Sequence, residues 1–169
     1  FISYCGCDIH FGDAEQDYVA GPDDPDPLHV EHRGYQNAKV VEKWAREHFL
    51  APDVVFVTGS SAGAYGAWFN APLFHDVWPN AQFHVLADAG NGVITHDFLA
   101  DEFLNWNFEA NLPPDVPAIA AVFEEGTGIP GYTKVVAREY PDTNWAHYTA
   151  AFDGGTGGQT GFYNVMLEE

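Results

Sequence analysis

The sequence predicts an α/β fold built on a mainly parallel sheet flanked by helices. Residues 53–59 (DVVFVTG) and 81–90 (AQFHVLADAG) are continuous apolar runs rich in β-branched and aromatic residues, which is typical of strands covered on both faces. Helical patterns alternate with these runs, and such alternation favours parallel strands. The chain has 169 residues, of which 46% are hydrophobic, so it can form one domain with a sizeable core.

The first fifty residues are expected to hold a strand end, a long loop and one helix. Residues 1–5 (FISYC) are predicted to end a strand, and 6–33 are predicted to be a loop because they are rich in Gly and Pro. From Gly34 to residue 50 apolar residues recur at helical spacing, and Pro52 follows the end of that pattern. The residues expected to share one face of this helix are Ala38, Val40, Val41, Trp44, Ala45 and Phe49.

The second half is expected to continue the alternation. Helical patterns cover residues 62–70, 96–108, 133–140 and 159–167, while strand-like patterns cover 118–123 and 144–153. Ligands of open parallel sheets bind outside the carboxyl ends of the strands. The polar residues that this assignment places at that edge are Ser61, Asp88 and Asp153.

Both ends of the sequence suggest a piece of a longer protein. Residue 1 is Phe and lies within a strand-like run, and the chain ends in a helical pattern without a stop signal. We therefore expect residues 1–169 to form a single partial domain, with N-terminal strands and a C-terminal segment outside it.

The charge balance excludes two classes of partner. The chain has 25 Asp and Glu against 6 Lys and Arg, a net charge of -19, so it repels nucleic acids and anionic membrane surfaces. A continuous apolar run of about 20 residues, the length needed to cross a membrane, does not occur. An acidic composition of this kind suits a saline habitat or an acidic extracellular protein.

The two cysteines, Cys5 and Cys7, give little sign of a metal site. With one residue between them they are poorly placed to bond each other, and no second pair follows at metal-ligand spacing. A buried thiol and a half-cystine with a partner elsewhere both remain open. No metal and no cofactor are expected.

A G-x-S-x-G motif, Gly59 to Gly63, follows the first apolar strand and opens a helix. In that setting the serine, Ser61, sits on a sharp turn that presents its hydroxyl as a nucleophile. Gly59 and Gly63 are expected to relieve crowding at the turn, and the backbone N–H of Ala62 is expected to face a developing oxyanion. A plain tight turn is the alternative interpretation.

A serine nucleophile needs a histidine base and an acid that orients the base. In α/β-hydrolases the chain order is serine, acid, histidine. Asp153 is the preferred acid because it ends a later strand, and Asp88, at the end of the next strand, is the alternative. All eight histidines precede Asp153 and are assigned structural roles, so the catalytic histidine is expected beyond Glu169.

Four stretches, in this order along the chain, resemble segments of pectin acetylesterases and the related Notum carboxylesterases. They are YCGCDIHFGD (4–13), HRGYQNAKVVEKW (32–44), TGSSAGAYG (58–66) and AFDGGTGGQTGFYN (151–164). The resemblance implies an α/β-hydrolase fold in which Ser61 is the nucleophile, Asp153 the acid and Ala62 one oxyanion donor. The family's N-terminal Gly-Gly oxyanion segment is absent, so this piece alone is expected to be inactive.

The function implied by the resemblance is a secreted or periplasmic serine carboxylesterase that deacetylates a polysaccharide through an acyl-enzyme. Its partner is then an acylated polysaccharide or another ester, without nucleic acid or membrane insertion. Two alternatives stay open: another α/β-hydrolase, such as a peptidase or a lipase-like enzyme, and a non-catalytic carbohydrate-binding relative. The second would use some of the five tryptophans as sugar-stacking surfaces.

Overall fold

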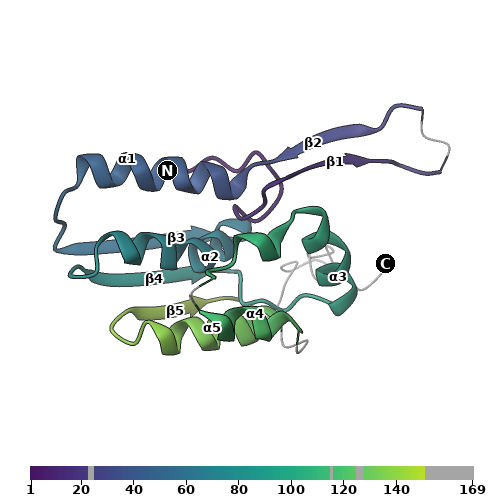
Figure 1. The fold of residues 1–169 in the computed structure, drawn as a ribbon. Coiled ribbons are helices and arrows are strands. Elements are labelled where there is room, and N and C mark those ends of the chain that lie inside the picture. Colours follow the sequence, from purple (N-terminus) through teal and green to yellow (C-terminus); the bar gives the residue numbers. More distant parts are fainter. Residues whose placement is uncertain (23–24, 115, 125–127, 151–169) are drawn as a thin grey trace.

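The computed structural model describes residues 1–22, 25–114, 116–124 and 128–150. The elements are β1 (Ala14–Tyr18), β2 (Leu28–His32), α1 (Gly34–His48), β3 (Val54–Ser60), α2 (Ala62–Val77), β4 (Gln82–Asp88), α3 (His96–Asn105), a 3-10 helix η1 (Phe108–Asn111), α4 (Pro117–Glu124), α5 (Gly128–Glu139) and β5 (Asn144–Tyr148). Figure 1 shows a body of sheet and helices from which the β1–β2 ribbon extends.

The body contains a three-stranded parallel sheet in the order β3-β4-β5. In its register, Ser60 at the end of β3 lies opposite Asp88, and Asp88 lies opposite Tyr148. The predicted α/β class and the strands predicted around residues 53–59 and 81–90 are therefore confirmed. The carboxyl ends of β3 and β4 meet at one edge, as the sequence pattern indicated.

Helix α2 packs over β3 and β4 and supplies much of the core. Two of its side chains, Trp68 and Phe69, are buried in a cluster with residues of α4 and α5, while Phe74 joins Phe83 and Val85 of β4 in a second cluster. The α2 sequence is apolar all round because it is surrounded by other elements.

The expectation that β3 is covered on both faces is wrong for the described residues. Val55 and Val57 pack into the core beneath α2. On the opposite face Val54 and Phe56 are 54% and 58% exposed. Among the described residues, helices therefore cover only one face of β3, although its sequence is continuously apolar.

Several predicted elements differ from the structure. Residues 1–5 form no strand, and the long loop predicted for 6–33 contains the antiparallel pair β1 and β2. The apolar run 118–123 lies in helix α4 instead of a strand. On α1, Val40 and Trp44 are 67% and 52% exposed, so they do not share the buried face.

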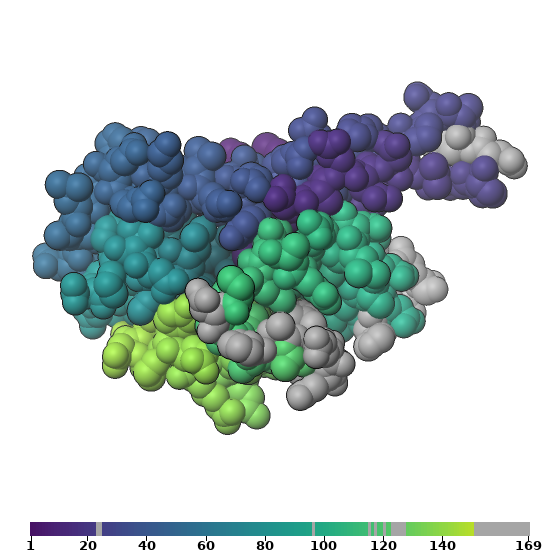
Figure 2. All heavy atoms as spheres, in the orientation of Figure 1, coloured from purple at the N-terminus to yellow at the C-terminus, as the bar shows by residue number. Residues whose placement is uncertain are grey.

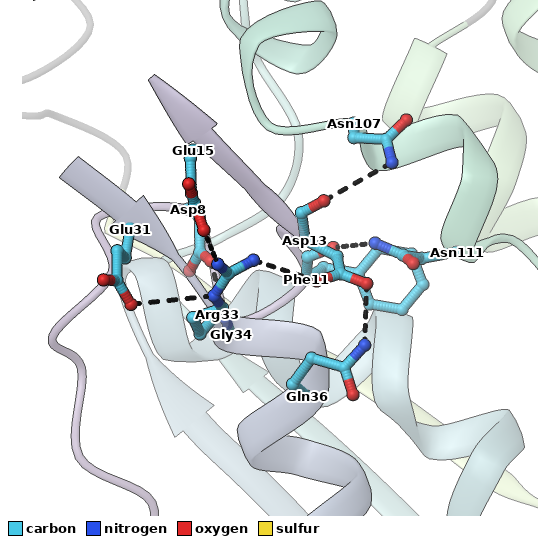
Figure 3. Close-up of polar contacts among 10 residues, drawn as sticks. All are labelled: Asp8, Phe11, Asp13, Glu15, Glu31, Arg33, Gly34, Gln36, Asn107 and Asn111. Carbon is cyan, nitrogen blue, oxygen red and sulfur yellow. Dashed lines mark hydrogen bonds and ion pairs between the residues drawn. The ribbon is translucent and has the colours of Figure 1, made fainter. Parts of the chain in front are cut away.

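The β1–β2 ribbon projects beyond the body and is held at its base (Figure 2). Arg33 forms ion pairs with Asp13, Glu15 and Glu31, as Figure 3 shows. Asp13 also accepts a hydrogen bond from Gln36 of α1, 2.7 Å away. These contacts tie both strands of the ribbon to the start of α1.

A buried carboxylate organises the loop that precedes the ribbon. Asp8 is fully buried and accepts hydrogen bonds from the backbone N–H of Gly34 at 2.7 Å and of His10 at 3.2 Å. Its side chain fills the space beside Gly6, Gly12 and Gly34, where an added Cβ would come within 3 Å of it. Asp8 thus satisfies a free donor at the positive N-terminal end of α1 and links that helix to the loop.

Replacing Asp8 by Ala is expected to lower the free energy of unfolding by about 2–3 kcal/mol, because the buried N–H of Gly34 and the partly buried N–H of His10 lose their acceptor. Chemical denaturation followed by circular dichroism measures the change.

The control is Asp17→Ala on β1, which removes an exposed pair with His29. That variant is expected to lose less than about 1 kcal/mol. Equal losses in the two variants would contradict the role assigned to Asp8.

Candidate active site

The site begins at the corner between β3 and α2. The strand ends at Ser60, the helix begins at Ala62, and Ser61 between them has φ 56° and ψ -121°. A positive φ is rare for a residue other than glycine, costs about 1–3 kcal/mol and is concentrated at functional sites. The backbone bonds on both sides of Ser61 fix this geometry: its N–H donates to the Asp88 carbonyl at 2.8 Å, and its carbonyl accepts from Ala64 N–H at 2.9 Å.

The two motif glycines have different surroundings. A Cβ added to Gly59 would lie 2.1 Å from the carbonyl oxygen of Gly63, so only glycine fits at that position. A Cβ on Gly63 meets no atom of the described residues within 4 Å. The crowding predicted at both glycines is therefore found at Gly59 alone. It is caused by the backbone carbonyl of Gly63.

The backbone N–H of Ala62 is a free donor at the positive end of α2. It is the first residue of the helix, and within the described chain it makes no hydrogen bond. A helix N-terminus favours negative charge through its unpaired N–H groups and its dipole. The arrangement suits the stabilisation of an anionic oxygen beside Ser61.

Ser61 lies on a cleft of about 850 Å³ that runs between β3, α1 and the first residues of the chain. Apolar side chains such as Val41, Val57 and Phe74 form much of its wall. Polar groups also line it, among them Tyr4, His10 and Asn70. A cleft of this size and mixed lining is typical of a small-molecule or substrate site.

His10 is the histidine that the structure, over its described residues, places in this cleft with Ser61. Its ring packs against the Cα of Gly66 on α2 and against Tyr4, whose ring centroid is 4.7 Å away. Its carbonyl accepts a hydrogen bond from Asn70 at 3.0 Å. Burial lowers the pKa of His10, and the nearby Asp8 carboxylate only partly opposes that shift.

Sequence reasoning assigned His10 a structural role and gave none to Tyr4 or Asn70. His10 and Tyr4 could have been found from their place in the stretch 4–13, which carries part of the family resemblance. Asn70 gave no such signal, because its contact with His10 joins residues 60 positions apart.

The structure describes one of the two candidate acids, Asp88. Asp88 ends β4 beside Ser61, but its side chain forms no hydrogen bond within the described chain; its backbone carbonyl instead binds the Ser61 N–H. Asp153 lies outside the described residues, so its role stays a prediction.

The remaining histidines of the described chain do not line this cleft. His84 and His147 lie in strands β4 and β5, as predicted, and burial lowers the pKa of His147 where its ring stacks on Trp68. His75 lies in α2, and His29 and His32 lie in β2.

The tryptophans offer little sugar-stacking surface. Trp44 is 52% exposed, whereas Trp68, Trp78 and Trp106 are buried. Trp145 is partly buried against the core. Of the five tryptophans, Trp44 on α1 is therefore the one that is largely exposed.

Within the described residues no group of three His, Cys, Asp or Glu side chains is arranged to hold a metal ion. Cys5 and Cys7 are both exposed and unbonded, so neither is the buried thiol that one interpretation suggested. Among the described helices none is long and apolar enough to cross a membrane.

A sequence model of the pectinacetylesterase family matches residues 1–116, that is 116 of the 169 residues. The matched range includes Ser61, Asp88 and the loop around Asp8, and it ends before Asp153. No curated protein and no solved structure matches the chain significantly.

The glycine geometry gives a matched pair of substitutions. Gly59→Ala is expected to destabilise the protein by at least about 2 kcal/mol, because the new methyl group overlaps the Gly63 carbonyl. Gly63→Ala is expected to be neutral or to stabilise by up to about 1 kcal/mol, because an open helical position gains from Ala. Thermal unfolding of both variants measures the difference; similar effects in the two would contradict this description of the corner.

Proposed function

The chain belongs to the pectinacetylesterase family, whose activity is the hydrolysis of carboxylic esters, and we propose that it contributes the nucleophile of a serine esterase with an α/β-hydrolase fold. The observation that carries the proposal is the strained corner at Ser61. A strand, a positive-φ serine and a helix follow one another there, which is the geometry of a nucleophile elbow.

In the proposed reaction the Ser61 Oγ attacks the carbonyl carbon of an ester while a histidine takes the hydroxyl proton. The Ala62 N–H and the dipole of α2 stabilise the negative oxygen of the tetrahedral intermediate. Collapse of the intermediate breaks the ester C–O bond, and the departing alcohol takes the proton from the histidine. Water then attacks the acyl-serine by the same route and releases the acid.

Asp153 is proposed to orient the histidine, and the histidine itself is proposed to lie beyond Glu169. The proposed substrate is an O-acylated polysaccharide met outside the cell, in keeping with a family whose members are generally extracellular. The apolar wall of the cleft beside Ser61 suits the acyl side of such an ester.

Replacing Ser61 by Ala in the natural full-length polypeptide is expected to reduce hydrolysis of p-nitrophenyl acetate by about a thousandfold or more, because no nucleophile remains. It should also abolish covalent labelling by a fluorophosphonate. Ser60→Ala is the matched control, since this neighbouring serine ends β3 without a positive φ. Unchanged hydrolysis in the Ser61 variant would refute the proposal.

The two candidate acids can be separated by paired amide substitutions. Asp153→Asn is expected to lower kcat by about 10³–10⁴ because the histidine loses its orienting acid. Asp88→Asn is expected to lower kcat less than tenfold, about 1.4 kcal/mol of barrier. A larger loss in the Asp88 variant, measured on the same ester, would transfer the acid role to Asp88.

A further inference from the structure

The chain turns sharply twice at the carboxyl edge of the sheet. The first turn is the corner at Ser61, between β3 and α2. The second follows β4, where Ala89 has φ 57°, a value that is uncommon for a residue with a side chain. Strands β3 and β4 lie side by side and both pack against α2 (Figure 1), so the two turns leave neighbouring strands.

The second turn is fixed by its backbone to the strands on either side. The Asp88 carbonyl accepts the hydrogen bond from Ser61 N–H at 2.8 Å, and the Ala89 N–H donates to the Tyr148 carbonyl of β5 at 2.7 Å. The turn therefore connects the corner at Ser61 with the end of β5. Asp88 makes this connection with its main chain, so a change of its side chain leaves the bond in place.

Gly90, the next residue, lies against the first turn of α2. A Cβ added to it would come 2.4 Å from the Cβ of Ala64 and 3.1 Å from the carbonyl oxygen of Ser61. Gly90 and Ala64 are both buried, and the Ala64 N–H donates to that same Ser61 carbonyl at 2.9 Å. The corner is thus held at its N–H by Asp88 and at its carbonyl side by Gly90.

These contacts bear on the reactivity of Ser61. A backbone in an uncommon conformation persists only where the surrounding structure determines it, and the turn after β4 supplies part of that structure. The Ser61 Oγ is attached to this backbone, so its place relative to an ester carbonyl depends on the same contacts. A displacement of about 1 Å can lower a reaction rate by about a hundredfold.

We propose that residues 88–90 form a positioning element for the Ser61 nucleophile, and that Gly90 acts through its close contact with Ala64 and the Ser61 carbonyl. The element acts on the backbone of the corner and not on the substrate. This inference rests on the proposed esterase function of Ser61.

The first test is Gly90→Ala in the natural full-length polypeptide. The new methyl group would overlap Ala64 and displace the first turn of α2, so the second-order rate of labelling by a fluorophosphonate is expected to fall by about ten- to a hundredfold. The kcat for p-nitrophenyl acetate should fall in parallel. Rates are expressed per folded protein, measured by circular dichroism. A folded Gly90→Ala variant that is labelled as fast as the unsubstituted protein would overturn the inference.

Gly92→Ala is the matched control in the same loop. Gly92 has φ 78°, and a Cβ there would lie 2.7 Å from the Cγ2 of Ile129, so the substitution disturbs the contact with α5 instead of the corner. This variant is expected to lose stability but to keep the labelling rate of its folded form within about twofold, because the geometry at Ser61 is retained. An equal loss of labelling in both variants would trace the effect to the stability of the loop and reject the positioning role.

Ala64→Gly provides a rescue. Combined with Gly90→Ala, it moves one methyl group from one side of the contact to the other and conserves the volume. Labelling of the double variant is expected to return to within about threefold of the unsubstituted protein. A folded double variant that stays as slow as Gly90→Ala would show that the effect does not pass through Ala64.

The same substitutions decide the case in which Gly90→Ala alone does not fold. Ala64→Gly leaves a gap one methyl group wide beside the corner, so labelling should slow by about two- to fivefold and recover when Gly90→Ala fills the gap. Equal rates in these two folded variants would overturn the inference. Failure of the esterase proposal itself is recognised separately, because mass spectrometry of the labelled, unsubstituted protein would then not find the label on Ser61.

Discussion

The close approach of Gly59 to the carbonyl of Gly63 is the constraint on which the candidate site depends. A chain that leaves a strand and enters a helix within one residue must bring these two backbone segments together, and a Cβ at position 59 would lie 2.1 Å from that oxygen. The same reversal gives Ser61 its positive φ and makes Ala62 the first residue of α2, with an N–H that has no hydrogen-bond partner among the described residues. The hydrogen bond from Ser61 N–H to the Asp88 carbonyl holds the corner to the neighbouring strand.

The second constraint is the buried carboxylate of Asp8, which determines what faces the corner. By binding the N–H groups of Gly34 and His10, it holds the loop against the start of α1. Cys7, Ile9 and His10 all adopt positive φ in wrapping around it, and the His10 ring comes to rest on Gly66 of α2. A loop far from Ser61 in sequence thereby forms one wall of its cleft.

Local patterns were sufficient to predict the strands of the sheet, helix α1 and the corner at Ser61, because strand–turn–helix geometry is encoded within a few neighbouring residues. They were insufficient where the structure depends on pairing or packing between residues far apart in the sequence. The β1–β2 ribbon was missed because its two strands are joined by a Gly- and Pro-rich segment that is typical of loops. The run 118–123 was misassigned because a short apolar run does not distinguish a strand from a helix buried among others. The place of His10 depends on contacts with α2 that no local pattern contains.

The β1–β2 ribbon has a consequence for the behaviour of the protein in concentrated solution. Among the described residues neither outer side of this two-stranded ribbon pairs with a further strand, and such edges can recruit strands from other molecules. Its exposed positions include Glu15, Asp17 and Glu31, which carry like charge on every copy. Two ribbons that met edge to edge would bring these carboxylates together, so the acidic composition also protects this projection against intermolecular sheet formation.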